Sequence, residues 1–281
     1  RTFITPRIYA VCAAGFCLLG TILRTVCMLT QFDAEVGYFD KGWLSTASRV
    51  LYFIAVACFV AGAFALPKGS VTSGLTSRTH TLAAYLLALT LAGFAVGTVI
   101  LWTESKEKNT LLLMAGAAAL SAVYFALTAS CKERIADGLA ALGAAPVLWG
   151  ILAVGETYVD PYTTINSPIK LALQMGFLGF MLVMTAELRF RLGKPSPRRA
   201  ICLHAVAAFT CLVASISTLA GFAADVKMNS LYPLYAAVLL AAGIQCCLII
   251  ALSGLRSTVK NEKGFTANID GKLLGTVTHE A

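Results

Sequence analysis

Long apolar runs separated by short polar segments dominate the chain. Eight such runs occur, at residues 7–30, 42–66, 81–103, 110–130, 138–156, 169–188, 200–224 and 232–255. A helix of about twenty apolar residues crosses the hydrocarbon core of a bilayer, which is about 30 Å thick. Inside lipid every backbone N–H and C=O must be paired within its own segment, so runs of this kind insert as helices. The pattern predicts an all-α polytopic membrane protein with eight transmembrane helices.

Composition supports the same class. Hydrophobic residues make up 58% of the chain, charged residues only 13%, and the mean hydropathy is +0.78. Soluble domains carry about 25% charged residues. The connecting segments are too short to fold alone, and the polar residues 256–281 predict a flexible cytoplasmic tail.

The distribution of basic residues predicts the orientation. Of the 22 Lys and Arg residues, fifteen fall on the side of the two termini, five on the other side, and two, Arg24 and Arg49, within the apolar runs. Because Lys and Arg are retained in cytoplasmic loops, both termini are expected inside the cell. The net charge of +8 then predicts contact with anionic lipids at the cytoplasmic face, without a nucleic-acid partner. Short loops and free thiols favour a prokaryotic plasma membrane. The sequence does not distinguish a homo-oligomer from a hetero-oligomer.

Three short matches suggest an internal duplication. Thr-x-x-Asp occurs at 30–33 and 157–160, Leu-Ala-Gly-Phe at 91–94 and 219–222, and related Pro/Lys/Gly turns at 66–69 and 192–195, with offsets of 126 to 128 residues. They predict two parallel four-helix halves, 1–134 and 135–255, with a ligand site between them. Chance is the alternative, because the matching residue types are common in apolar helices.

Two arginines within the runs are the first site candidates, because a charged side chain inside a membrane is costly and by default marks a functional site. Arg24 lies six residues before the end of the first run, about 9 Å below the outer boundary, and Arg49 is similarly deep in the second. With the hydroxyl residues Thr25, Ser45, Thr46 and Ser48 they predict a cationic pocket, open to the outside, for a small anionic ligand. The alternative is that both reach the headgroups or form ion pairs with the outer acidic residues Asp33, Glu156 and Asp160.

The run at 169–188 adds Gln174 and Glu187 as candidate ligand-binding residues. A polar path from the arginines past Gln174 to Glu187 would favour transport. Gln174 is otherwise expected to bridge helices by a hydrogen bond, and Glu187 to be neutralised by a neighbouring arginine.

No hydrolase, metalloprotease or nucleotide-binding motif occurs, so an enzyme is not predicted, nor a cofactor or metal site. The nine cysteines follow no C-x-x-C spacing and are expected to be small buried hydrophobes. Two functional classes are left. The first, which we favour, is a transporter or channel for a small solute, with an anion as the candidate. The second is a sensor, accessory subunit or scaffold that transports nothing.

Overall fold

The computed structural model describes residues 4–33, 36–40, 42–66, 78–105, 109–130, 141–164, 166–192 and 196–253. Within them the helices are α1 (Pro6–Thr30), α2 (Trp43–Ala65), α3 (Arg78–Ser105), α4 (Asn109–Ser130), α6 (Ala144–Val159), α7 (Pro168–Arg191), α8 (Pro197–Ala223) and a last helix, Leu231–Ser253. A two-stranded antiparallel hairpin, β1 (Phe32–Asp33) and β2 (Tyr38–Phe39), joins α1 to α2 and pairs Phe32 with Phe39.

The helices follow the apolar runs, with ends that differ by a few residues. Seven of those in the described ranges are long and apolar enough to cross a membrane. The helix Ala144–Val159 has 16 residues and spans about 24 Å, less than a hydrocarbon core. Residues 131–140, where this run was expected to begin, lie outside the described residues. The protein is therefore an all-α, multi-pass integral membrane protein, and the eighth crossing stays a prediction.

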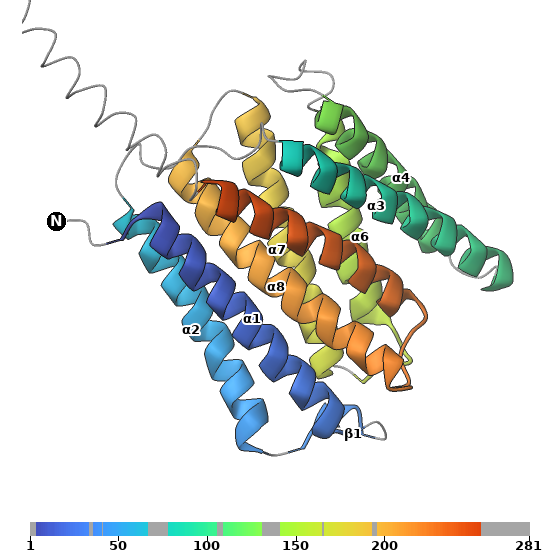
Figure 1. The fold of residues 1–281 in the computed structure, drawn as a ribbon. Coiled ribbons are helices and arrows are strands. Elements are labelled where there is room, and N and C mark those ends of the chain that lie inside the picture. The colour runs from blue at the N-terminus through green and yellow to red at the C-terminus, as the bar shows by residue number, and fades with distance from the viewer. Residues whose placement is uncertain are drawn as a thin grey trace, which may run out of the picture.

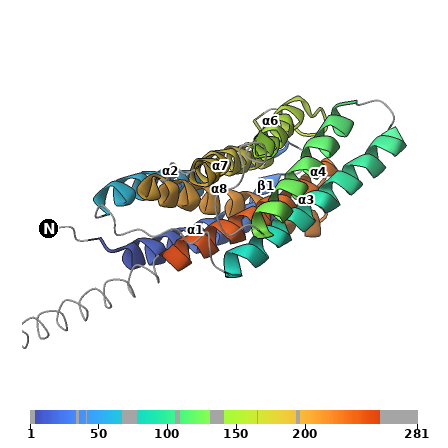
Figure 2. The ribbon, with the colours of Figure 1, turned by 90° about the horizontal axis from the view of Figure 1, so that it is seen from above.

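The last helix lies at the centre of the bundle. Its Tyr235 packs against aromatic rings of α3, α6 and α7, and Leu212 of α8 approaches its Gly243. The hairpin α1–α2 lies on one side of this centre and the hairpin α3–α4 on the other (Figures 1 and 2). Consistent with that layout, α7, α8 and the last helix are more buried than α1 to α4.

The two sequence halves are interleaved in space. α8 packs on both α1 and α2, while α6 packs on α4. The duplication, with its boundary at 134/135, stays a prediction. The predicted tail 256–281 lies outside the described residues.

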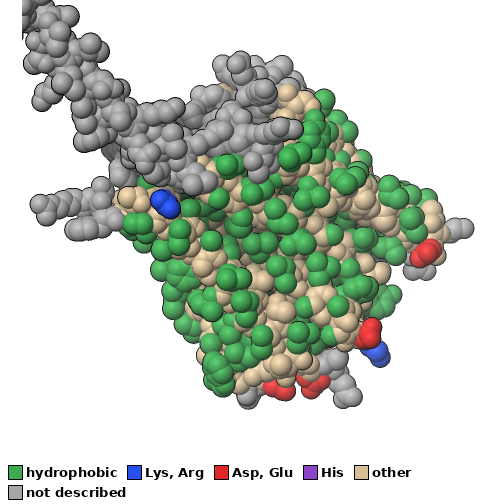
Figure 3. Space-filling model, viewed as in Figure 1, with side chains coloured by type: hydrophobic (Ala, Val, Ile, Leu, Met, Phe, Trp, Pro, Cys, Tyr) green, Lys and Arg blue, Asp and Glu red, His purple; other side chains and the backbone are tan. Residues whose placement is uncertain are grey.

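The first helix begins and the last helix ends at the same end of the bundle. The start of α1 and the end of the last helix occupy one end, called here the terminal end, and the β1–β2 hairpin lies at the other, the hairpin end (Figure 1). In Figure 3 hydrophobic side chains cover the surface between the two ends, and the visible acidic side chains lie away from the terminal end. A hydrophobic surface of this extent is stable in lipid, so the bilayer surrounds the bundle between its two ends. The cytoplasmic position of the terminal end stays a prediction.

Several basic residues that are predicted to lie at the terminal end are outside the described residues, among them Lys68, Lys132, Arg134 and Lys194. Those that are described include Arg7, Arg189 and Arg199, and all three are exposed. Their contact with anionic lipids stays a prediction.

Close packing of α7 on α8 depends on Gly179. A Cβ atom at this position would come within 3.2 Å of the Cα atom of Ala207 and would collide with the Thr210 side chain. A larger residue therefore has to push the two helices apart.

We expect Gly179→Val to lower the free energy of unfolding by about 1–3 kcal/mol, the usual cost of overpacking. The matched control is Gly93→Val, because a Cβ at Gly93 meets nothing within 4 Å. Melting temperatures in detergent measure both. Equal losses in the two variants would mean that the cost comes from valine in a helix and not from the α7–α8 contact.

Candidate ligand-binding cleft

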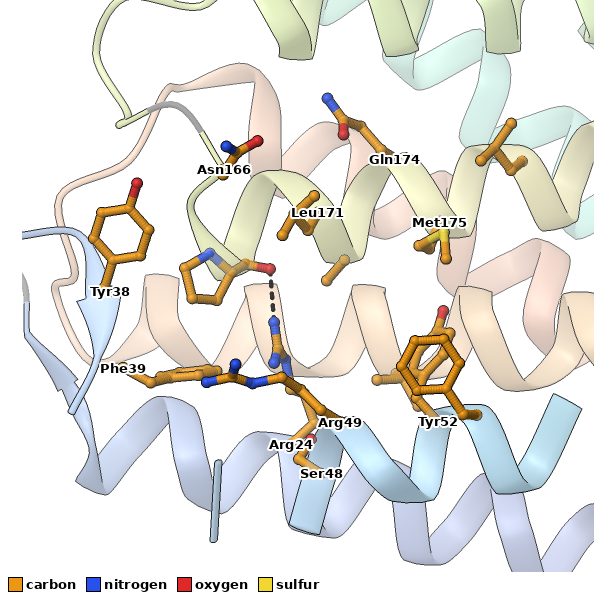
Figure 4. Close-up of a pocket in the computed structure, with 15 residues that line it drawn as sticks. Arg24, Tyr38, Phe39, Ser48, Arg49, Tyr52, Asn166, Leu171, Gln174 and Met175 are labelled. Atoms are coloured by element: carbon orange, nitrogen blue, oxygen red, sulfur yellow. Dashed lines mark hydrogen bonds between the residues drawn. The ribbon is translucent and has the colours of Figure 1, made fainter. Parts of the chain in front are cut away.

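A cleft of about 470 Å³ opens at the hairpin end between α2 and α7. Arg24 of α1 and Val213 of α8 also line it, and β2 contributes Tyr38 and Phe39, which are drawn with Arg24 in Figure 4. Its volume is within the range of about 300–1000 Å³ that is usual for small-molecule sites. Most of its lining is apolar, and among the described residues that line it the charged ones are the two arginines of the apolar runs, Arg24 and Arg49.

The guanidinium group of Arg24 is held from two sides. Its Nη2 atom donates a hydrogen bond of 2.6 Å to the backbone carbonyl of Pro168, and its Cζ atom lies 4.5 Å from the ring centroid of Phe39. A carbonyl and the face of an aromatic ring both stabilise a cation, the second by a cation–π interaction. Arg24 is therefore oriented across the cleft without any carboxylate.

Arg49 extends from α2 into the same space and its side chain is exposed. Neither Arg24 nor Arg49 forms an ion pair with a residue in the described ranges, and no hydrogen bond fixes Arg49 there. Two like charges therefore share one apolar cleft. Arg24 is half-buried and Arg49 is exposed, and the apolar lining beside them makes their repulsion stronger than it would be in water.

A third donor lies one turn deeper along α2. The hydroxyl group of Tyr52 is buried and has no hydrogen-bond partner among the described residues. The ring packs edge-on against Phe209 of α8, which fixes its position, and the hydroxyl points toward α7 (Figure 4). A buried hydroxyl without a partner costs free energy, so Tyr52 offers an unused donor to whatever occupies the cleft.

The start of α7 is defined by its local sequence. Asn166 takes the left-handed backbone conformation, with φ at 62°, and ends the loop from α6. The hydroxyl of Ser167 then accepts a hydrogen bond from the backbone N–H of Ile169, and Pro168 occupies the first helical position. This Asn-Ser-Pro signal places the Pro168 carbonyl at the mouth of the cleft.

A buried polar cluster fixes the preceding loop. The carboxylate of Asp160 accepts hydrogen bonds from the Tyr232 hydroxyl at 2.6 Å, from Asn229 at 3.0 Å and from the backbone of Tyr162 at 3.1 Å. Lys170 is buried and donates to the Asp160 backbone carbonyl at 2.6 Å. Burial raises the pKa of the Asp160 carboxyl, but these hydrogen bonds outweigh burial and hold the pKa below its ordinary value.

The structure brings together three of the five predicted site residues. Arg24, Arg49 and Gln174 all line the cleft, although the Gln174 amide points away from the guanidinium groups (Figure 4). Ser45 is not part of the lining: it is buried, and its hydroxyl donates to the Gly42 carbonyl at 3.0 Å. Its neighbour one turn along, Ser48, lines the cleft instead.

Glu187 lies far from this cleft. It is 13 residues beyond Gln174 on α7, about 20 Å along the helix axis. The side chains of α7 buried between them are all apolar and are Phe177, Phe180, Val183, Met184 and Ala186. Along α7 the described residues therefore do not form the polar path to Glu187 that would favour transport.

An aromatic cluster fills the middle of the bundle at the depth of Phe177 and Phe180 on α7. Trp149 of α6 packs edge-on against Phe94, Phe177 and Phe180, with ring centroids 5.4 to 5.6 Å apart. Tyr235 of the last helix stacks on Phe94 and completes the cluster. This cluster separates the polar groups around Asp160 from those at the terminal end.

Sequence reasoning missed Phe39, Tyr52 and Pro168. Phe39 belongs to a strand of two residues, which is too short for a periodic signal, and Tyr52 looks like any aromatic residue of an apolar helix. The Asn-Ser-Pro signal does predict where α7 begins, but not which arginine would contact that turn.

Compared with protein-family models, with curated proteins and with solved structures, the chain matches none of them. The chemistry of the cleft is therefore the basis for any assignment of function. That chemistry consists of two cations and an unused hydroxyl donor inside an apolar space.

Proposed function

We propose that the protein binds an anionic ligand in this cleft and acts as a membrane-embedded receptor or sensor. The observation that carries the proposal is the pair Arg24 and Arg49, which share an apolar cleft without an ion-pair partner among the described residues. A guanidinium group binds carboxylate or phosphate through two parallel hydrogen bonds. An anion between the two arginines would remove their repulsion and gain from the low dielectric constant around them.

A small-solute transporter is the second candidate. It is favoured by one observation: the cleft is lined from both sequence halves, by Arg24 and Arg49 of the first and Asn166 and Gln174 of the second. Repeat-built transporters bind their substrate between halves in this way. The apolar stretch of α7 beyond Gln174 and the aromatic cluster around Trp149 argue against a continuous polar conduit. We therefore rank the receptor above the transporter.

The location of this activity follows the sequence predictions. We place the protein in a prokaryotic plasma membrane, with the hairpin end and its cleft facing outward, because the basic residues favour the terminal end as cytoplasmic. A ligand would then reach the arginines from outside the cell or from the outer leaflet.

Thermal stabilisation of the purified protein in detergent tests anion binding. We expect a carboxylate or phosphate compound to raise the melting temperature in a dose-dependent way, because a ligand that binds only the folded state stabilises it. Arg24→Gln and Arg49→Gln should each weaken binding by about tenfold, so the shift at a given ligand concentration becomes much smaller. The matched control Arg199→Gln removes an exposed arginine at the terminal end and should keep it.

Two outcomes would overturn the proposal: no anion stabilises the wild-type protein, or Arg199→Gln loses the shift as fully as the cleft variants. Uptake of a stabilising anion into proteoliposomes, lost in Arg24→Gln, would instead move the assignment to the transporter.

A further inference from the structure

The cleft is open toward the bilayer and not only toward the aqueous surface. Four of its lining residues also belong to the lipid-facing surface: Phe53 is 75% exposed, and Leu171, Met175 and Leu178 are 42% to 46% exposed. From Leu171 to Leu178 this apolar wall runs about 10 Å along α7, away from the hairpin end. A hydrocarbon chain can therefore enter sideways between α2 and α7.

The polar groups of the cleft are arranged by depth. The backbones of Arg24 and Arg49 lie six residues, or about 9 Å, from the hairpin end of their helices, and the Arg24 guanidinium reaches back to Pro168, the first residue of α7, toward the level of lipid headgroups. The Tyr52 hydroxyl lies on the next turn of α2, about 4.5 Å deeper and opposite Met175 (Figure 4), and the apolar wall of α7 continues past it to Leu178. This order matches an anionic ester-linked phospholipid, in which the negative phosphate is followed by ester carbonyl acceptors and then by hydrocarbon.

We propose that the ligand is a phospholipid with an anionic headgroup, taken up from the leaflet at the hairpin end. Its phosphate lies between Arg24 and Arg49, an ester carbonyl accepts the hydrogen bond of Tyr52, and one acyl chain follows Phe53, Met175 and Leu178. This inference rests on the proposed anion binding and adds the class of ligand. Charge complementarity selects this occupant over a neutral lipid, which would leave both cations unpaired.

The first test compares phospholipids with their headgroups. We expect phosphatidylglycerol or phosphatidic acid to stabilise the detergent-solubilised protein, and phosphatidylcholine and glycerol 3-phosphate to do so at least about tenfold more weakly. Arg49→Gln should weaken binding of the anionic lipid by about tenfold, the loss of one charge-assisted contact. Arg199→Gln should not change it, and an equal loss there would place the lipid at the terminal end and overturn the proposal.

The second test addresses the acyl chain. Leu178→Trp adds a large ring to the apolar wall and fills the space next to it. The control Leu182→Trp adds the same ring one turn away, at a residue that is equally exposed but does not line the cleft. We expect only Leu178→Trp to weaken the anionic lipid, with the melting temperature without lipid as a check on folding. If glycerol 3-phosphate binds as well as the lipid and Leu178→Trp has no effect, anion binding stands and the lipid proposal fails.

The third test addresses Tyr52. Wild type should prefer a diester phosphatidylglycerol to its diether analogue, and Tyr52→Phe should remove that preference while keeping the requirement for Arg49. A preference that survives in Tyr52→Phe would overturn the ester contact. If no anion binds at all, lipid or soluble, the proposed function fails together with this inference.

Discussion

Trp149→Ala is expected to lower the free energy of unfolding by about 3–5 kcal/mol, the usual cost of removing a large buried aromatic side chain. Trp149 is fully buried and packs edge-on against Phe94, Phe177 and Phe180 from two other helices. Its removal leaves a cavity where α3, α6, α7 and the last helix meet. The melting temperature in detergent should fall by about 10 °C.

The matched variant is Trp149→Phe. The indole N–H of Trp149 has no hydrogen-bond partner among the described residues, so its loss leaves no acceptor unpaired. Phenylalanine keeps the aromatic contacts and should cost well under half as much as alanine. If Trp149→Phe were as unstable as Trp149→Ala, the indole N–H would have to make a contact that ring packing does not explain.

The second large effect is expected at Asp160. Asp160→Ala removes the acceptor of the Tyr232 hydroxyl and of the Asn229 amide, while the hydrogen bond of Lys170 to the backbone carbonyl of residue 160 can remain. Buried donors left unpaired cost about 1–3 kcal/mol each, so we expect a loss of about 2–5 kcal/mol at neutral pH. The exposed Asp40 provides the control, and Asp40→Ala should lose little.

The same residue sets an acid dependence. Because the folded-state pKa of Asp160 lies below its ordinary value, the carboxylate stabilises the fold at neutral pH and loses this contribution as the pH falls through that lowered pKa. Melting temperatures measured from pH 7 downward should therefore fall more steeply for wild type than for Asp160→Ala. Parallel curves for the two proteins would contradict this role.

The helices were predictable because one physical requirement sets them. A run such as 200–224 is long and apolar, and in lipid it pairs its backbone only as a helix, here Pro197–Ala223. The run at 138–156 was harder, since the described helix Ala144–Val159 is shorter and ends later. Apolar length does not fix where a short helix begins.

The sequence predicted those residues of the candidate site that are charged and lie within apolar runs. Arg24 and Arg49 stood out because a cation inside an apolar run is costly, and both line the cleft. Glu187 stood out for the same reason, but 13 residues are about 3.6 turns, which puts it on a different face of α7 from Gln174 and far along the axis. Ser45 shares α2 with Arg49, but its hydroxyl is used by the Gly42 carbonyl at the helix start.

The sideways opening between Phe53 and Leu178 determines which concentration of the ligand controls its binding. A molecule that enters through that opening has first dissolved in the membrane, so its occupancy follows its mole fraction among the surrounding lipids and not its concentration in water. Diluting a sample with buffer would leave that mole fraction unchanged, whereas adding detergent or neutral lipid would lower it. The affinity of a membrane-dissolved ligand for the cleft is therefore expressed as a mole fraction, and an abundant lipid can fill the site even when its affinity on that scale is weak.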